Sequence, residues 1–122
     1  MSYVQGFVIP VLEANRKAYR DLAAKTAPIF MEYGATRIVE TWGDNIPDGT
    51  TTDFRRAVKA EEGENVVFSW IVWPDKATAD AAHEKIFNDP RMAAPDGSIP
   101  FDGKRMIYGG FVPIFDTDEG AP

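Results

Sequence analysis

The fold is decided by one stretch of the chain, Glu64-Asn65-Val66-Val67-Phe68-Ser69-Trp70-Ile71-Val72-Trp73. Side chains alternate between the two faces of a β-strand. One face would carry Val66, Phe68, Trp70 and Val72, and the other would carry Val67, Ser69, Ile71 and Trp73. A strand with one face in water alternates apolar with polar residues, and this stretch does not. The pattern therefore predicts a central strand that is covered on both faces, with Ser69 as its single polar interruption.

Composition limits the classes to which this 122-residue chain can belong. With 44% hydrophobic and 26% charged residues it is typical of one globular domain with one hydrophobic core. The net charge of −6 repels phosphate backbones, so we expect no nucleic-acid partner. The sequence contains no cysteine, which excludes disulfides, thiolate nucleophiles and Cys-ligated metal sites. No apolar run is long enough to span a bilayer and no leader pattern opens the chain, so we expect a cytoplasmic protein without a membrane partner.

The first half of the chain predicts a strand, a helix and a second strand. Tyr3 to Val11 and Ala35 to Trp42 have strand-like patterns. Between them a helix is expected to begin at Asn15, as its N-cap, and to run to about Tyr33. Pro28 predicts a kink in this helix, and Gly34 is expected to end it in the left-handed conformation.

The second half repeats this order. After the central strand, Asp75 is expected to cap a helix that runs to about Asn88, and Lys104 to Phe115 predicts the last strand. Alternation over Phe54 to Ala60 predicts an extra short hairpin strand ahead of the central strand. We expect residues 1–115 to form a single domain and residues 116–122 to form an acidic tail.

The βαββαβ order is typical of a ferredoxin-like α+β sandwich, in which two helices cover one face of an antiparallel sheet. In a monomer the other face of that sheet would lie in water. The first, central and last strands nevertheless carry apolar side chains on both faces. A second copy of the same sheet is the simplest cover, so we predict a two-fold homodimer with a barrel of eight or more strands between the protomers.

Several strings of sequence together are similar to one known family. They are Ser2-Tyr3-Val4 with Gly6-Phe7-Val8, Ala18-Tyr19-Arg20, Ala27-Pro28, Val66-Val67-Phe68-Ser69-Trp70-Ile71-Val72, Asp89-Pro90-Arg91-Met92, and Pro100-Phe101-Asp102-Gly103-Lys104-Arg105-Met106-Ile107-Tyr108-Gly109-Gly110-Phe111, the most specific. Except for the acidic tail, the chain closely resembles the bacterial family called domain of unknown function 1428 (DUF1428). The resemblance implies the dimeric α/β-barrel superfamily, whose relatives include cofactor-independent monooxygenases, haem-degrading enzymes and small-molecule-binding regulators. It implies no particular reaction.

His83 is the only histidine and therefore the only side chain whose ordinary pKa lies near neutrality. It could act as a catalytic base at the mouth of a cavity, or it could be a partly buried helical residue that is hydrogen-bonded to backbone. One histidine without cysteine cannot build the ligand sets of common transition-metal sites. We therefore expect no metal site and no cofactor.

Four residues are candidates for ligand binding. Arg91 could bind the carboxylate or phosphate of a small anion, or pair with nearby acidic residues. Trp42, Trp70 and Tyr108 could line an aromatic pocket between sheet and helices, or form the core of a dimer. Gly109-Gly110 in the last strand would either leave space for a cavity or allow close approach of another group. The acidic residues Glu40 and Asp44, near Trp42, could include a general base.

Two function hypotheses follow. In the first, each protomer binds a small aromatic or anionic molecule in a pocket lined by Trp42, Trp70, His83 and Tyr108, with cofactor-independent monooxygenase-like or isomerase-like chemistry. In the second, the protein is a non-catalytic binding or sensing module whose barrel is an interaction scaffold. The sheet face that carries Trp70 separates a role in the pocket from a role in the dimer core.

Overall fold

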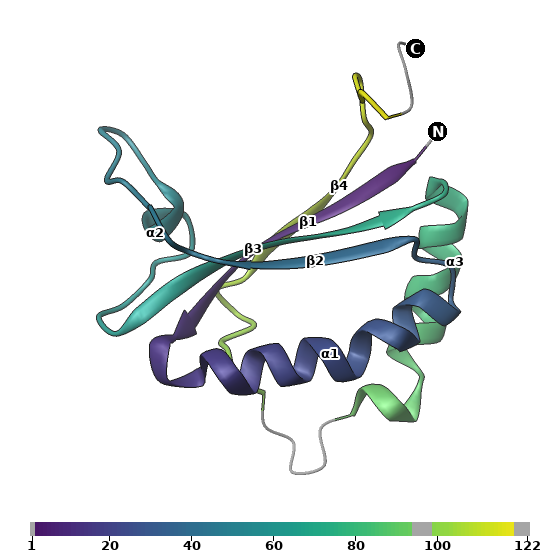
Figure 1. Cartoon of the computed structure of the whole chain (residues 1–122), viewed down its shortest axis with the longest axis horizontal. Coiled ribbons are helices and arrows are strands. Elements are labelled where there is room, and N and C mark those ends of the chain that lie inside the picture. Colours follow the sequence, from purple (N-terminus) through teal and green to yellow (C-terminus); the bar gives the residue numbers. More distant parts are fainter. Residues whose placement is uncertain (1, 94–98, 119–122) are drawn as a thin grey trace.

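The structure, a computed structural model, describes residues 2–93 and 99–118. Its elements are β1 (Tyr3–Leu12), η1 (Glu13–Asn15), α1 (Arg16–Glu32), β2 (Arg37–Trp42), α2 (Phe54–Ala57), β3 (Glu64–Trp73), α3 (Lys76–Phe87), η2 (Pro90–Met92) and β4 (Ile107–Phe111). Within the described residues the strands form one antiparallel sheet in the order β2-β3-β1-β4, and α1 and α3 lie on the same side of it (Figure 1). This arrangement confirms the predicted ferredoxin-like α+β fold.

The strand β3 is central, as its sequence predicts. It pairs with β1 along its whole length, from Glu64 opposite Leu12 to Trp73 opposite Tyr3, and with β2 on its other side. The face that carries Val67, Ser69, Ile71 and Trp73 is buried beneath the helices. The face that carries Phe68 and Trp70 lies on the side of the sheet without α1 and α3, and Phe68 is 45% exposed.

The core lies between the sheet and the two long helices. Ile71 and Trp73 of β3 pack against Ala79, Ala82 and Ile86 of α3, where the small alanine side chains allow the helix to lie close to the sheet. A second cluster joins Tyr19 of α1 to Ile9, Val11 and Val67 of the sheet. Burial of these apolar surfaces is the main force that holds the helices on this face.

Most helix ends lie where the sequence predicts them, with one difference in capping. Asp75 caps α3, because its Oδ1 accepts a hydrogen bond from the Thr78 N–H at 2.7 Å. Gly34 follows α1 with a φ of 114°, as expected. Asn15 precedes α1, but its amide donates to the Pro100 carbonyl at 3.5 Å and does not cap the helix. Pro28 lies inside α1, and the kink expected there stays a prediction.

Among the described residues, no helix combines the length and apolar character needed to cross a membrane.

The predicted extra hairpin strand is wrong, because residues 54–57 form the short helix α2. Asp53 caps it through a 2.7 Å hydrogen bond from the Arg56 N–H to Oδ1. The Arg56 guanidinium also binds the Gly49 and Thr51 carbonyls and so closes the loop onto the helix. Phe54 and Val58 are four residues apart, which suits one side of a helix as well as one face of a strand. The N-cap decides between the two.

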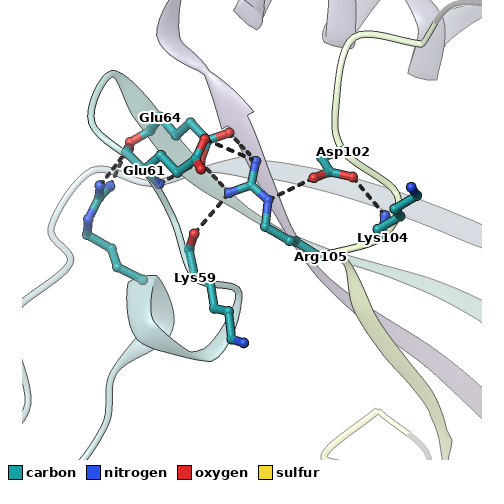
Figure 2. Close-up of polar contacts among 7 residues, drawn as sticks. Lys59, Glu61, Glu64, Asp102, Lys104 and Arg105 are labelled. Carbon is teal, nitrogen blue, oxygen red and sulfur yellow. Dashed lines mark hydrogen bonds and ion pairs between the residues drawn. The ribbon is translucent and has the colours of Figure 1, made fainter.

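An ion-pair network fixes the start of β3 to the turn before β4 (Figure 2). Arg105 donates from Nη1 and Nη2 to the two carboxylate oxygens of Glu64, each at 2.7 Å. Its Nε donates to Asp102 at 2.8 Å, and Nη1 also reaches the Lys59 carbonyl at 2.9 Å. Because Arg105 lies in this turn, β4 begins at Ile107, later than predicted.

Candidate functional site

A cavity of about 780 Å³ lies between α1, the helix-covered face of the sheet, and the segments 91–93 and 99–106. Most of its wall is apolar, formed by residues that include Phe7, Ile9, Leu22, Phe30, Ile38, Ile71, Met92, Phe101 and Met106. Polar side chains also line it, and three of them, Tyr19, Glu40 and Ser69, come together at one place in the wall. Its volume and its mixture of apolar wall and few polar groups are those of small-molecule sites.

The three polar groups meet because of strand register and helix placement. Glu40 of β2 lies directly opposite Ser69 of β3, so both side chains are on the helix-covered face. Tyr19 comes from the apolar stripe of α1 that packs on this face. Its hydroxyl donates to Glu40, with Oη and Oε1 2.6 Å apart. Tyr19 and Ser69 are buried, whereas more than a third of Glu40 remains exposed, on an edge strand beside the open cavity.

This environment raises two pKa values. Burial, reinforced by the adjacent Glu40 charge, raises the pKa of the Tyr19 hydroxyl far above its usual range, so Tyr19 remains a neutral donor. Partial desolvation raises the pKa of Glu40, and hydrogen bonds from Tyr19 and Ser69 oppose that rise. No charged side chain is among the described groups that shift the pKa of Glu40. Its carboxylate is therefore held by neutral donors alone.

Arg91 lines the same cavity and is held by acidic neighbours. Its Nη1 lies 2.7 Å from Glu32 Oε2, and its Nη2 lies 2.8 Å from Asp89 Oδ2. Asp89 also accepts a hydrogen bond from the Tyr33 hydroxyl at 2.8 Å. Arg91 thus fastens η2 to the end of α1, and two carboxylates balance its charge.

The sequence pattern of a family described as "Protein of unknown function (DUF1428)" matches residues 2–103. The chain belongs to the DUF1428 family. "Uncharacterized protein YbaA" from Escherichia coli K12 is 60% identical over 116 residues, which cover 95% of this chain and 99% of that protein. The same figures hold for YbaA from Shigella flexneri. A solved structure described as a dimeric ferredoxin-like protein from an uncultured marine organism shares the fold, with a TM-score of 0.60 at 10% identity over 96% of this chain and 100% of that one.

In this DUF1428 chain the predicted site residues lie in different places. Arg91 lines the cavity described above, and Trp42, Trp70, His83 and Tyr108 are not among its lining residues. Trp42 packs beside Tyr19 and Val67 on the helix-covered face, and the Arg16 guanidinium lies 5.4 Å from its ring centroid. Tyr108 stacks on Phe7 at the edge of the sheet, with ring centroids 6.3 Å apart. The roles predicted for these residues stay predictions.

His83 of α3 is exposed to solvent, but its Nε2 accepts a hydrogen bond from the amide of the buried Gln5. The Gln5 carbonyl oxygen in turn accepts from the Trp73 indole N–H at 2.8 Å, so the contact orients the imidazole and satisfies a buried amide. Trp70 lies on the other face of the sheet, tilted against Phe68 at 5.7 Å. Its ring therefore lies on the side of the sheet away from α1 and α3.

The glycine pair in β4 permits close approach. The Tyr3 ring lies where a side chain on Gly110 would point. Among the described residues, no three histidine, aspartate or glutamate side chains are grouped to hold a metal ion. Gly110 does not line the cavity. The polar groups available there for chemistry are those of Tyr19, Glu40 and Ser69.

Sequence reasoning identified Glu40 as a possible base but did not connect it to Tyr19 or Ser69. A signal was present, because Glu40 lies between Ile38 and Trp42 on one strand face, and Ser69 interrupts an apolar face of the central strand. Polar residues in such positions require hydrogen-bond partners when the face is buried. Two such residues on strands that pair in this DUF1428 fold indicate a polar site on the covered face.

Proposed function

We propose that the protein binds a small, largely apolar molecule in the cavity between α1 and the sheet. The observation that carries the proposal is the convergence of Tyr19, Glu40 and Ser69 on an apolar space of about 780 Å³. Protein interiors are close-packed, so a folded domain has no structural need for a space of this size beneath a helix. An apolar wall with a few oriented polar groups suits a ligand that has an apolar body and one polar end.

Isomerase-type proton transfer in the same cavity is the second candidate function. Glu40 is accessible, its pKa is raised, and the neutral hydroxyls of Tyr19 and Ser69 lie beside it. A carboxylate in such surroundings can accept a proton from a bound ligand and return it to another atom, while a neighbouring hydroxyl donates a hydrogen bond to the oxygen that becomes negative. The alternative remains binding without turnover, as in a sensing module.

We also propose that the protein is a homodimer. The face of the sheet opposite α1 and α3 is apolar, and Phe68, Trp70, Ile107 and Phe111 lie on it. Phe111 is 60% exposed and Ile107 is 45% exposed in the single chain. Large apolar side chains gathered on one open face favour association, and a second copy would present the same surface.

Blocking the cavity tests the binding proposal. Ala23 of α1 lines the cavity, whereas its neighbour Ala24 is exposed and points elsewhere. In nitrogen-15 NMR titrations with the neutral probe 2-phenylethanol, we expect shifts in the amides of Ser69 and Ile71 for the wild type and for Ala24→Trp. Ala23→Trp should abolish these shifts while the protein stays folded. Binding that is equally strong in Ala23→Trp, or shifts that lie outside the cavity, would contradict the proposal.

A further inference from the structure

We propose that the ligand of this cavity carries a protonated amine and that the Glu40 carboxylate binds it. This inference rests on the proposed function, since it assigns a ligand class to the same cavity. It replaces the anionic ligand that Arg91 alone would favour. Three observations support it: the neutral partners of Glu40, the two carboxylates that hold Arg91, and the aromatic rings in the wall of the cavity.

Among the residues that the structure describes, the hydrogen-bond donors to Glu40 are neutral hydroxyl groups. Tyr19 donates to one carboxylate oxygen at 2.6 Å, and the Ser69 hydroxyl adds a second neutral donor. Within the described part of the chain, Glu40 takes part in no ion pair. A carboxylate can accept about four hydrogen bonds, so acceptor sites remain for a ligand. An ammonium group would add charge-assisted hydrogen bonds in a setting less polar than water.

The other charged residues that line the cavity are Asp21, Lys25 and Arg91. Asp21 is paired with Lys17 at 2.9 Å and lies 3.7 Å from Arg20. Arg91 is held by Glu32 and Asp89, and the negative charges of these two carboxylates repel an anionic ligand. Lys25 lies on the exposed part of α1. Lys25 and Glu40 are thus the charged lining residues without an ion pair among the described residues, and Glu40 is the one that lies beside Tyr19 and Ser69.

The wall of the cavity also suits a cation with an aromatic or apolar body. Phe7, Phe30 and Phe101 line it. Phe101 meets Tyr19 edge-on, with ring centroids 5.7 Å apart, which places this ring close to the residue that holds Glu40. Ring faces attract ammonium groups, and the rings offer apolar contact to the rest of the ligand.

Three probes of nearly equal shape separate charge from shape: 2-phenylethylamine, 2-phenylethanol and 3-phenylpropanoate. Titrations at neutral pH, followed by nitrogen-15 NMR shifts of the cavity amides, measure each dissociation constant. We expect the amine to bind about tenfold tighter than the alcohol, and the carboxylate to bind most weakly. The preference for the amine should shrink as sodium chloride is raised, since salt screens the attraction to a partly exposed carboxylate.

Substitution of Glu40 tests the assignment. Glu40→Gln keeps the shape and the acceptor for Tyr19 but removes the charge, so the amine should bind no better than the alcohol. Glu40→Asp keeps the charge and should retain a preference for the amine, and the exposed control Glu84→Gln should behave as the wild type. If the alcohol or the carboxylate binds the wild type as well as the amine does, or if Glu40→Gln still prefers the amine, the inference of an amine ligand is wrong. The proposal that the cavity binds a small molecule would then still stand. If none of the three probes binds in the cavity, the proposed function fails with the inference.

Discussion

Glu40 and Glu64 show how neighbouring groups set the properties of a carboxylate in this protein. Glu64 is 9% exposed and meets a bidentate arginine, which lowers its pKa through hydrogen bonds from Arg105. Glu40 is more exposed but meets only neutral hydroxyls, and partial desolvation raises its pKa. The first carboxylate is committed to the fold. The second keeps acceptor capacity and is available to a ligand or a proton.

The raised pKa of Glu40 predicts a pH dependence of stability. Its unfolded value is near 4.5, and its folded value is higher, so the folded state binds more protons between the two. Glu40 therefore lowers stability as pH rises through that window. Glu40→Gln should remove this loss and raise the Tm at neutral pH by roughly 2 °C. Thermal unfolding across the window measures it, with Glu84→Gln as the control. A Tm that falls in Glu40→Gln would show that the carboxylate stabilises the fold.

Single residues were the hardest feature to predict from sequence. Tyr19 looks like an ordinary member of an apolar helical stripe, and only the packing of α1 across β2 and β3 brings its hydroxyl to Glu40. Arg91 was a candidate for anion binding, but its partners Glu32 and Asp89 come from a helix end and a turn whose proximity depends on the fold. Periodicity indicates the face on which a residue lies, and tertiary packing decides which groups meet there.

At the scale of elements, a long run of apolar alternation predicted its strand correctly, and a short run did not. The bounds of β3 agree with the prediction because ten residues of apolar alternation and strong strand formers have no competing explanation. Residues 54–60 carried a weaker pattern that suits both a strand and a helix, and the Asp53 cap selects the helix. Such a cap is a local hydrogen bond that can outweigh alternation over so few residues.

The network around Arg105 makes a prediction for the attachment of β3 to the turn before β4. Arg105→Met would leave Glu64 without its bidentate partner, which should lower the Tm at neutral pH by roughly 10 °C. Because the folded pKa of Glu64 lies below its unfolded value of 4.5, this stabilisation is present above that value and is lost as pH falls. The difference in Tm between wild type and variant should therefore shrink in acid.

The double variant Glu64→Gln with Arg105→Met provides the control for this prediction. Removing both charges avoids a stranded carboxylate, so the double variant should recover part of the lost Tm. Differential scanning calorimetry of the four proteins measures the coupling. A difference between wild type and Arg105→Met that stays the same in acid would show that the ion pair does not carry the effect.

At the scale of the whole molecule, the two faces of the sheet have different uses. The face beneath α1 and α3 contains the main core and the cavity, so a ligand there would contact residues of one chain. The opposite face carries Trp70 between Gly6 and Val39 of the neighbouring strands, remote from that cavity. The sequence left open whether Trp70 lines a ligand pocket or belongs to a dimer core. Its place on this face makes the association of two chains the property to test.

Association through this face predicts the mass of the protein in solution. Sedimentation equilibrium at micromolar concentration should give twice the 13.5 kDa of one chain. Trp70→Lys places a charge in the middle of the apolar face and should weaken the dimer at least about 100-fold, because a charge buried there would have no partner. Phe87→Lys is the matched control, since Phe87 is 88% exposed at the end of α3 and lies off that face. A wild-type mass of one chain, or a Trp70→Lys variant that dimerises as well as Phe87→Lys, would exclude the face opposite α1 and α3 as the interface.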